Sequence, residues 1–296
     1  MQAKIRDTTI YFDVDGASLV SDGQRMYERP TAFLIHGGPG GDHTSQKARY
    51  GQLRERMQLV YFDHRGQGRS ARRDPAKYTL DENVEDMEAL RVHLGLNAIV
   101  SIGTSYGGMV AMAHAARYPD AVSHLVLIAT AAHAGIIDRS KQIVRERGTT
   151  EQVSVCEAFW GGLIDTPEKM RHYFDVMGPL YSCTHSANPA PMSPEAILSP
   201  EALNRAYAPS GCMRNFDLRP ELTCIKAPTL ILAGRHDWIC APEFSAEIHQ
   251  LVAHSDLRIF EHSSHSIARD EPRQLLDAIA GFLVYNSRSS APCTES

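Results

Sequence analysis

The chain has 296 residues, of which 43% are apolar and 22% charged, and its formal net charge is −5. This length fits one α/β domain with an insertion, and the apolar fraction is sufficient for a substantial core. The negative charge argues against a nucleic-acid partner, and no apolar run is long enough to span a membrane, so we expect neither partner.

The N-terminal segment predicts a strand and a turn. Met1–Asp7 is charged and strand-like, which is unlike a secretory signal peptide. Lys4–Val14 alternates between apolar and polar residues and predicts an antiparallel edge strand. The polar stretch Gly16–Arg29 then predicts a surface turn.

A glycine-rich loop follows the next predicted strand. Ala32–His36 has the pattern of a buried strand, and Gly37–Gly41 contains four glycines and one proline. A loop with so few side chains lets backbone amides approach a substrate closely. We expect the amide of Gly38 to donate to an oxyanion and His36 to support the loop. The alternative is an ordinary Gly-Pro turn.

The region after Gln58–Phe62, a predicted core strand, has a structural rather than a catalytic pattern. Asp63–Ser70 is rich in Gly and Arg but lacks the phosphate-binding Gly-x-x-x-x-Gly-Lys pattern. We expect Asp63 and Arg65 to pair internally, because isolated charges at a sheet edge are costly. Thr79 then begins a capping-box pattern, which predicts a helix.

Residues 103–108 read Gly-Thr-Ser-Tyr-Gly-Gly between an apolar run and an amphipathic stretch. Gly-x-Ser-x-Gly in a strand–turn–helix context exposes a serine hydroxyl on a sharp turn. Ser105 is therefore the candidate nucleophile. The amide of Tyr106, at a helix N-terminus, is the second candidate oxyanion donor. The alternative is a Gly-rich turn with an unreactive serine.

An insertion interrupts the alternation of strands and helices. The strands predicted at Ser123–Ala129 and Thr229–Ala233 are about 100 residues apart, far more than an ordinary crossover needs. We expect a helical cap over residues 131–224 and a core of residues 1–130 and 225–296. Helices are predicted near Ser140–Glu157 and Pro167–Met177. Candidate pocket residues from the cap are Phe159, Trp160, Tyr173, Phe174, Tyr181, Tyr207 and Phe216.

Two polar residues near the C-terminus complete a possible catalytic triad. Asp237 follows the Thr229–Ala233 strand, and His265 lies between the short strand Leu257–Phe260 and a final helix. A histidine takes the serine proton and returns it to the leaving group, while a carboxylate fixes the imidazole tautomer. The neighbouring His262 is the alternative base, and we expect it to face solvent.

These motifs together resemble the α/β-hydrolase superfamily, and within it the proline iminopeptidase group of serine aminopeptidases. The shared segments are His36–Gly40, Asp63–Ser70, Gly103–Gly108, Gly234–Asp237 and Ser264–His265 with the downstream Asp-Glu-Pro. The resemblance implies an α/β-hydrolase fold with a mostly parallel sheet, helices on both faces and an inserted helical cap. It also implies an acyl-enzyme mechanism without metal or cofactor.

The resemblance further implies acidic side chains that hold the free amine of a peptide substrate, from the cap and from the position beside the triad aspartate. Here Trp238 occupies that position, and Arg214 and Asn215 stand where the cap glutamate is expected. Either another cap acid binds the amine, or the substrate has no free amine and the protein is an esterase, lactonase or amidase. The acids available for the amine are Glu157, Asp217 and Glu221.

The expected partner is a small molecule or short peptide, bound by Trp238, Trp160, Phe159, Asn215 and Glu157. The six cysteines have no metal-type spacing, which favours free thiols in a reducing cytoplasm. The alternative outside enzymology is a non-catalytic receptor that retains the triad. Oligomeric state does not follow from the sequence.

Overall fold

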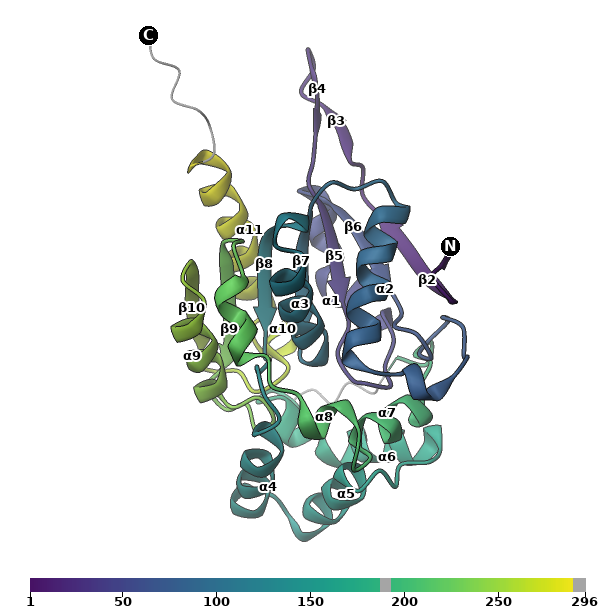
Figure 1. The fold of residues 1–296 in the computed structure, drawn as a ribbon. Helices are drawn as coiled ribbons and strands as arrows, with labels where there is room; N and C mark the ends of the chain where they lie inside the picture. Colours follow the sequence, from purple (N-terminus) through teal and green to yellow (C-terminus); the bar gives the residue numbers. More distant parts are fainter. Residues whose placement is uncertain (187–192, 290–296) are drawn as a thin grey trace.

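The computed structural model describes residues 1–186 and 193–289 and is built on one central sheet (Figure 1). The sheet has eight strands in the order β1-β2-β6-β5-β7-β8-β9-β10. β1 pairs antiparallel with β2, and β2 with β6, whereas all further pairs are parallel. The strands are β1 (Gln2–Ile5), β2 (Thr8–Asp15), β5 (Thr31–Ile35), β6 (Gln58–Phe62), β7 (Ile99–Thr104), β8 (Val122–Ile128), β9 (Thr229–Gly234) and β10 (Ser255–Phe260).

Two N-terminal predictions differ from the structure in detail. The single edge strand predicted at Lys4–Val14 is a hairpin, because Arg6 adopts a positive φ of 47° and reverses the chain between β1 and β2. The predicted surface turn 16–29 contains a second hairpin of β3 (Leu19–Ser21) and β4 (Met26–Glu28). This hairpin projects away from the sheet (Figure 1).

Helices cover both faces of the sheet, as the sequence predicts. Along β5, Phe33 and Ile35 pack into one hydrophobic core while Ala32 and Leu34 pack into the other. A continuous apolar strand is thus buried on both sides. The first face is covered by α2 (Leu80–His93), α3 (Tyr106–Arg117) and α9 (Pro242–Leu251), and the second by α1 (Thr44–Tyr50), the 3-10 helix η1 (Gly51–Glu55) and α11 (Pro272–Ser289).

Helix α2 begins where the capping pattern predicts. The Thr79 side chain accepts a hydrogen bond from the Glu82 amide, which satisfies one of the free donors at the helix start. Its buried residues Leu80, Val84, Met87 and Leu90 recur at helical spacing and pack into the first core.

Among the described residues between β8 and β9, five α-helices lie together at one end of the sheet, and we call them the cap helices (Figure 1). The helix predicted at 140–157 is two helices, because Gly148 ends the first and Thr149 caps the second in a capping box with Gln152. The cap helices are α4 (Ile136–Arg147), α5 (Thr150–Trp160), α6 (Pro167–Tyr181), α7 (Pro200–Tyr207) and α8 (Cys212–Asn215).

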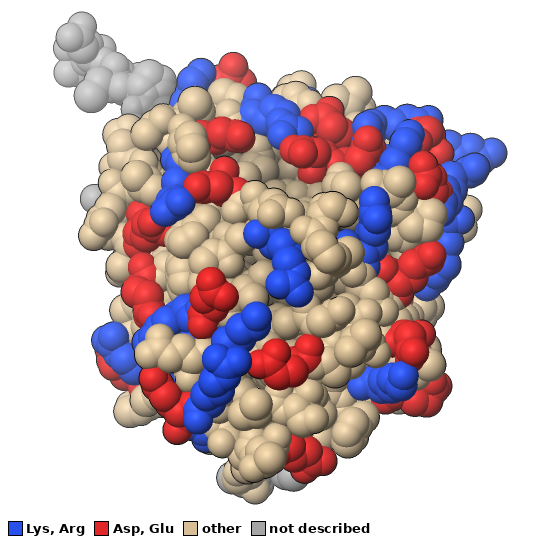
Figure 2. All heavy atoms as spheres, turned by 60° about the horizontal axis from the view of Figure 1, so that its bottom comes forward, with Lys and Arg blue, Asp and Glu red and all other residues tan. Residues whose placement is uncertain are grey.

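The surface over the cap helices carries both signs of charge. Figure 2 shows Lys and Arg side chains interspersed with Asp and Glu across this face. Several of them form exposed ion pairs, such as Arg145–Glu157 at 3.0 Å and Lys169–Asp165 at 2.7 Å. In the described ranges, every helix is either too short or too polar to cross a membrane.

Candidate active site

Ser105 sits on a sharp turn between β7 and α3. Its φ of 55° and ψ of −122° lie outside the regions that non-glycine residues ordinarily adopt. The turn requires glycine on either side, because a Cβ added to Gly103 would lie 2.3 Å from the Gly107 carbonyl oxygen. A Cβ added to Gly107 would lie 2.1 Å from the Ile35 carbonyl oxygen. The strained elbow predicted by the motif is therefore present in the backbone.

Hydrogen bonds from the neighbouring strand fix this turn. The Ser105 amide donates to the carbonyl of Ile128 at 2.9 Å, and the Thr130 hydroxyl donates to the Ser105 carbonyl at 2.8 Å. Tyr106, the next residue, is the first of α3, where the helix geometry leaves an amide without an intrahelical partner. Its phenol is buried and accepts from the Asn83 side chain at 2.8 Å.

The glycine-rich loop lies directly against Ser105. A Cβ added to Gly37 would be 3.2 Å from the Ser105 Cβ. His36 is buried, and its Nε2 accepts from the His64 amide at 3.2 Å, which places the ring hydrogen on Nδ1. Nδ1 lies 2.8 Å from the Gly37 carbonyl oxygen and donates to it. Burial lowers the pKa of His36, so the ring stays neutral and keeps this tautomer.

This bond fixes the direction of the next amide. In a planar trans peptide the C=O and N–H groups point in opposite directions. Because the Gly37 carbonyl points toward His36, the Gly38 N–H points away from it. Gly38 also has a φ of 136°, which is accessible to glycine and not to residues with a Cβ.

Asp237 and His265 form a buried hydrogen-bonded pair. The His265 Nδ1 and the Asp237 Oδ2 are 2.8 Å apart. The other carboxylate oxygen accepts from the amides of Ile239 at 2.9 Å and Cys240 at 3.0 Å. The loop carrying His265 crosses β9 at Gly234, where a Cβ would lie 2.1 Å from the Ser264 carbonyl oxygen. With one oxygen committed to backbone donors, the carboxylate orients the imidazole.

The three triad candidates follow strands at one edge of the sheet. Ser105 follows β7, Asp237 follows β9 and His265 follows β10, and these strands are parallel. The carboxyl ends of parallel strands are where open α/β sheets bind their ligands. The alternative base His262 is exposed, as predicted.

Asp63 and Arg65 both pair inside the protein, but with partners from other elements and not with each other. Asp63 accepts from the His43 Nδ1 at 2.8 Å, and Arg65 binds Asp86 through two nitrogens at 2.6 Å. Burial alone would raise the pKa of Asp63, but the hydrogen bonds that its carboxylate accepts from His43 and from the Arg69 amide bring it below its usual value.

A chain of aromatic side chains from the cap and the core leads to His265. The Tyr181 ring lies edge-on to the His265 ring at 5.6 Å and contacts the Trp238 ring at 5.5 Å. Trp238 in turn contacts Trp160 at 6.4 Å. Phe159 stacks on Tyr173 at 4.4 Å in the same hydrophobic core. Three predicted substrate-binding residues, Trp238, Trp160 and Phe159, thus belong to the aromatic cluster that reaches the histidine.

The structure does not bring the other two predicted binding residues into this cluster. Glu157 is exposed and pairs with Arg145 on the outer surface of the cap. Asn215 is exposed, and its amide donates to the carbonyls of Pro209 and Gly211. The remaining candidates for amine binding, Asp217 and Glu221, are exposed as well. Asp217 is held by Arg219, whose hydrogen bond lowers the Asp217 pKa to about 2.

The comparisons with known proteins agree with the fold. Residues 30–272 match the family model described as the alpha/beta hydrolase fold. The chain belongs to the α/β-hydrolase family. It is 29% identical over 265 residues to the proline iminopeptidase PfmaB of Pestalotiopsis fici, covering 87% of this chain and 92% of that protein. It is 27% identical to a proline iminopeptidase of Lactobacillus helveticus, covering 82% and 85%.

Among solved structures, the proline iminopeptidase of Mycobacterium smegmatis superimposes with a TM-score of 0.77. The match covers 98% of this chain and 99% of that one, at 18% sequence identity. At this identity the likeness shows a shared fold alone.

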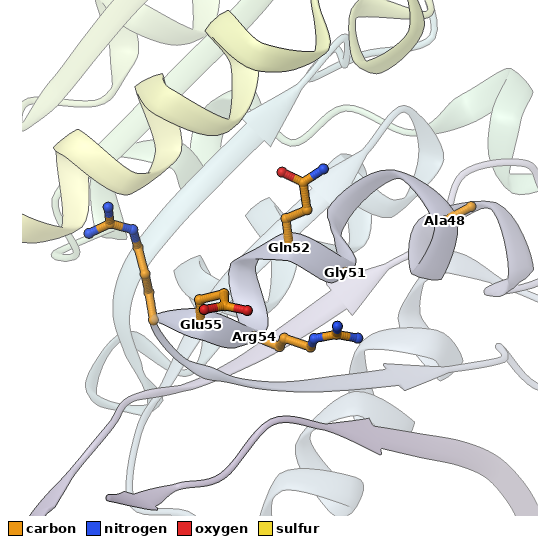
Figure 3. A pocket seen from close by; sticks show the side chains of 6 residues that line it. Ala48, Gly51, Gln52, Arg54 and Glu55 are labelled. Atoms are coloured by element: carbon orange, nitrogen blue, oxygen red, sulfur yellow. The ribbon is translucent and has the colours of Figure 1, made fainter. Parts of the chain in front are cut away.

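A surface hollow elsewhere on this α/β hydrolase does not belong to the candidate site. Figure 3 shows it against α1 and η1, lined by Ala48, Gly51, Gln52, Arg54, Glu55 and Arg56. Because η1 precedes β6, the hollow lies near the amino ends of the parallel strands, opposite the edge that carries Ser105. Within residues 1–186 and 193–289, no group of three or more His, Cys, Asp or Glu could hold a metal ion.

One polar residue next to the histidine loop does not follow from the motifs. Asp270 belongs to the Asp-Glu-Pro segment downstream of His265, and its carboxylate contacts both this loop and the end of cap helix α6. An acid five residues after the candidate base is a visible signal, but its partners from the cap are more than 80 residues away in the chain.

Proposed function

We propose that the protein is a serine hydrolase in which Ser105 forms an acyl-enzyme. The observation that carries this proposal is the hydrogen-bonded Asp237–His265 pair at the sheet edge where Ser105 occupies its strained turn. A nucleophile, a base and an oriented carboxylate at that edge form the arrangement of acyl-transfer enzymes.

In the proposed reaction, the Ser105 Oγ attacks the substrate carbonyl carbon while His265 Nε2 takes the hydroxyl proton. The Asp237 carboxylate stabilises the resulting imidazolium through Nδ1–H. The negative oxygen of the tetrahedral intermediate accepts from the amides of Gly38 and Tyr106. The imidazolium then gives its proton to the leaving group as the carbonyl–leaving group bond breaks. Water repeats the sequence on the acyl-enzyme and releases the acid.

A first substrate class, short peptides with an N-terminal proline or similar residue, is supported by the printed names of the relatives. Proteins from both Pestalotiopsis fici and Lactobacillus helveticus that align with most of this chain are called proline iminopeptidases. The aromatic cluster that reaches His265 would offer apolar contacts to such a substrate. A cap over the site also favours small substrates over folded chains.

A second class, carboxylic esters or lactones without a free amine, is favoured by a specific observation. The four buried acids of the described residues, Asp42, Asp63, Asp86 and Asp237, are all engaged. Their respective partners are Arg69, His43, Arg65 and His265. Beside Asp237 stands the buried indole of Trp238. An ammonium group buried without a carboxylate is costly.

Hydrolysis of matched substrates separates these classes. We would compare prolyl-p-nitroanilide, its N-acetyl derivative and short-chain p-nitrophenyl esters, with Ser105→Ala as the control. Turnover of the anilide that requires the free amine supports the peptidase. Turnover of the esters alone supports the esterase. Equal turnover by wild type and Ser105→Ala contradicts the proposed mechanism for both.

A further inference from the structure

We propose that residues 180–184, at the end of cap helix α6, position the catalytic histidine and that Asp270 couples them to it. We call residues 180–184 the cap anchor. The inference rests on His265 being the general base proposed above. It adds a positioning role for cap residues that do not themselves contact the reacting atoms.

The Asp270 carboxylate gathers donors from two distant parts of the chain. In the cap anchor, the Ser182 hydroxyl donates to it at 2.5 Å and the Cys183 amide at 3.1 Å. Thr184 donates twice, through its amide at 3.1 Å and its hydroxyl at 3.0 Å. From the histidine loop it accepts from the Ser264 amide at 2.9 Å. The residue immediately before His265 and the cap anchor are therefore held by one carboxylate.

Direct bonds reinforce this connection on both sides of His265. The Ser264 hydroxyl donates to the Leu180 carbonyl at 2.6 Å. The Ser266 amide donates to the Tyr181 carbonyl at 2.9 Å. Both neighbours of the histidine are thus bonded to the cap anchor, and the Tyr181 ring lies against the imidazole itself. The Tyr181 hydroxyl is in turn 3.2 Å from that of Tyr173, within the same helix.

The core supplies a different set of contacts to the same loop. Glu271 accepts from the Ser263 hydroxyl at 2.7 Å and the His262 amide at 3.2 Å. The His236 amide donates to the Ser263 carbonyl at 3.0 Å. These contacts hold the part of the loop before residue 264. One further core contact reaches Ser264, whose hydroxyl also donates to the His236 carbonyl at 3.1 Å. The segment that orients His265 is held largely from the cap.

The chemical consequence follows from the demands of proton transfer. The imidazole must keep Nδ1 on Asp237 while Nε2 faces the serine oxygen, and a small misplacement of a catalytic group costs much of its rate. Replacing the Asp270 carboxylate by an amide puts an NH2 group opposite backbone N–H donors. The cap anchor then separates from the loop, and His265 loses one of its supports.

The test measures the base without assuming a substrate. Labelling of Ser105 by a fluorophosphonate depends on proton removal from the serine. The labelling rate is compared in wild type, Asp270→Asn and the double variant Ser182→Ala/Thr184→Val, which changes only cap residues. Asp277→Asn is the matched control, on the exposed face of α11. Proton NMR follows the downfield resonance of the His265 Nδ1–H, assigned by its loss in His265→Ala. Thermal unfolding checks that each variant folds.

We expect Asp270→Asn to label at least ten-fold more slowly, since bonds to a charged group are lost, and the double variant roughly three-fold more slowly. The His265 resonance should broaden or shift in both, with Asp277→Asn unchanged. If Asp270→Asn does not fold, the double variant, altered only in the cap, decides the question.

The outcomes separate this inference from the function on which it rests. Labelling that persists in His265→Ala overturns the proposed base itself. If His265→Ala does not label but Asp270→Asn and the double variant label as wild type, the base stands and the positioning role is wrong. If Asp270→Asn labels slowly but the double variant labels at the wild-type rate, Asp270 acts only through the core loop. That result also overturns the coupling to the cap.

Discussion

Replacing Asp237 by asparagine should invert the tautomer of His265 while leaving the fold in place. One carboxylate oxygen accepts from the amides of Ile239 and Cys240, and the other from the His265 Nδ1. In the variant, the amide oxygen stays on the two backbone donors, because an NH2 group there would face two N–H groups. The NH2 then faces Nδ1, which must become an acceptor, and the ring proton moves to Nε2.

The magnitude follows from what Nε2 can no longer do. A protonated Nε2 cannot take the Ser105 proton, and the same change in a Ser-His-Asp protease lowers kcat by about 10⁴. That factor corresponds to about 5 kcal/mol of transition-state stabilisation. Because asparagine has nearly the shape of aspartate, we expect a much smaller effect on unfolding.

The assay is the rate of fluorophosphonate labelling and of p-nitrophenyl ester hydrolysis at neutral pH, with a urea unfolding curve for each protein. Asp277→Asn, an exposed substitution of the same kind, is the control. The reasoning is refuted if a folded Asp237→Asn keeps more than about a tenth of the wild-type labelling rate, because the tautomer would then not matter.

Two further predictions concern stability. Gly107→Ala should destabilise the fold by about 3 kcal/mol or more, because the new Cβ meets the Ile35 carbonyl oxygen. Gly51→Ala should be neutral or stabilising by up to about 1 kcal/mol, because the nearest atom to its new Cβ is 3.9 Å away. Urea unfolding measures both changes. Burial raises the pKa of Glu88, but hydrogen bonds from a neighbouring arginine and from His114 lower it from 4.5 to about 2. A depressed folded pKa gives stability that is complete above pH 4.5 and lost toward pH 2. Because solvent screens this partly exposed group, we expect wild type to lose about 1 kcal/mol more than Glu88→Gln between pH 6 and pH 3, which urea midpoints at the two pH values would show.

The parts of the site that short sequence patterns encode were predictable. The turn at Ser105 needs glycines at fixed offsets, because the start of α3 passes within van der Waals contact of β5 and β7. The capped start of α2 depends on Thr79 and Glu82, which are three residues apart. Such local requirements leave a readable pattern in the chain.

The cap was less predictable because its contacts are made between distant segments. On α5, Cys156, Phe159 and Trp160 form the buried stripe at helical spacing, and Glu157 falls on the other side, where it meets Arg145. Asn215 ends a four-residue helix and folds back onto nearby carbonyls. Position in the chain indicates these two as binding residues, but their side chains lie away from the aromatic cluster.

The same limit applies to charged groups. Asp63 and Arg65 are two residues apart and of opposite charge, yet each has a better partner from another element, His43 and Asp86. Asp270 meets its partners only because α6 ends beside the histidine loop. Pairing across the fold depends on tertiary placement, which spacing in the sequence does not report.

The central claim, that Ser105 is a nucleophile activated by His265, is tested most directly by locating a covalent adduct. The protein would be treated with a fluorophosphonate, digested and mapped by mass spectrometry, beside Ser105→Ala and His265→Ala. We predict one adduct per chain on the peptide that contains Ser105, absent in Ser105→Ala and formed far more slowly in His265→Ala. An unlabelled wild-type protein, or an adduct on another residue, would contradict the account.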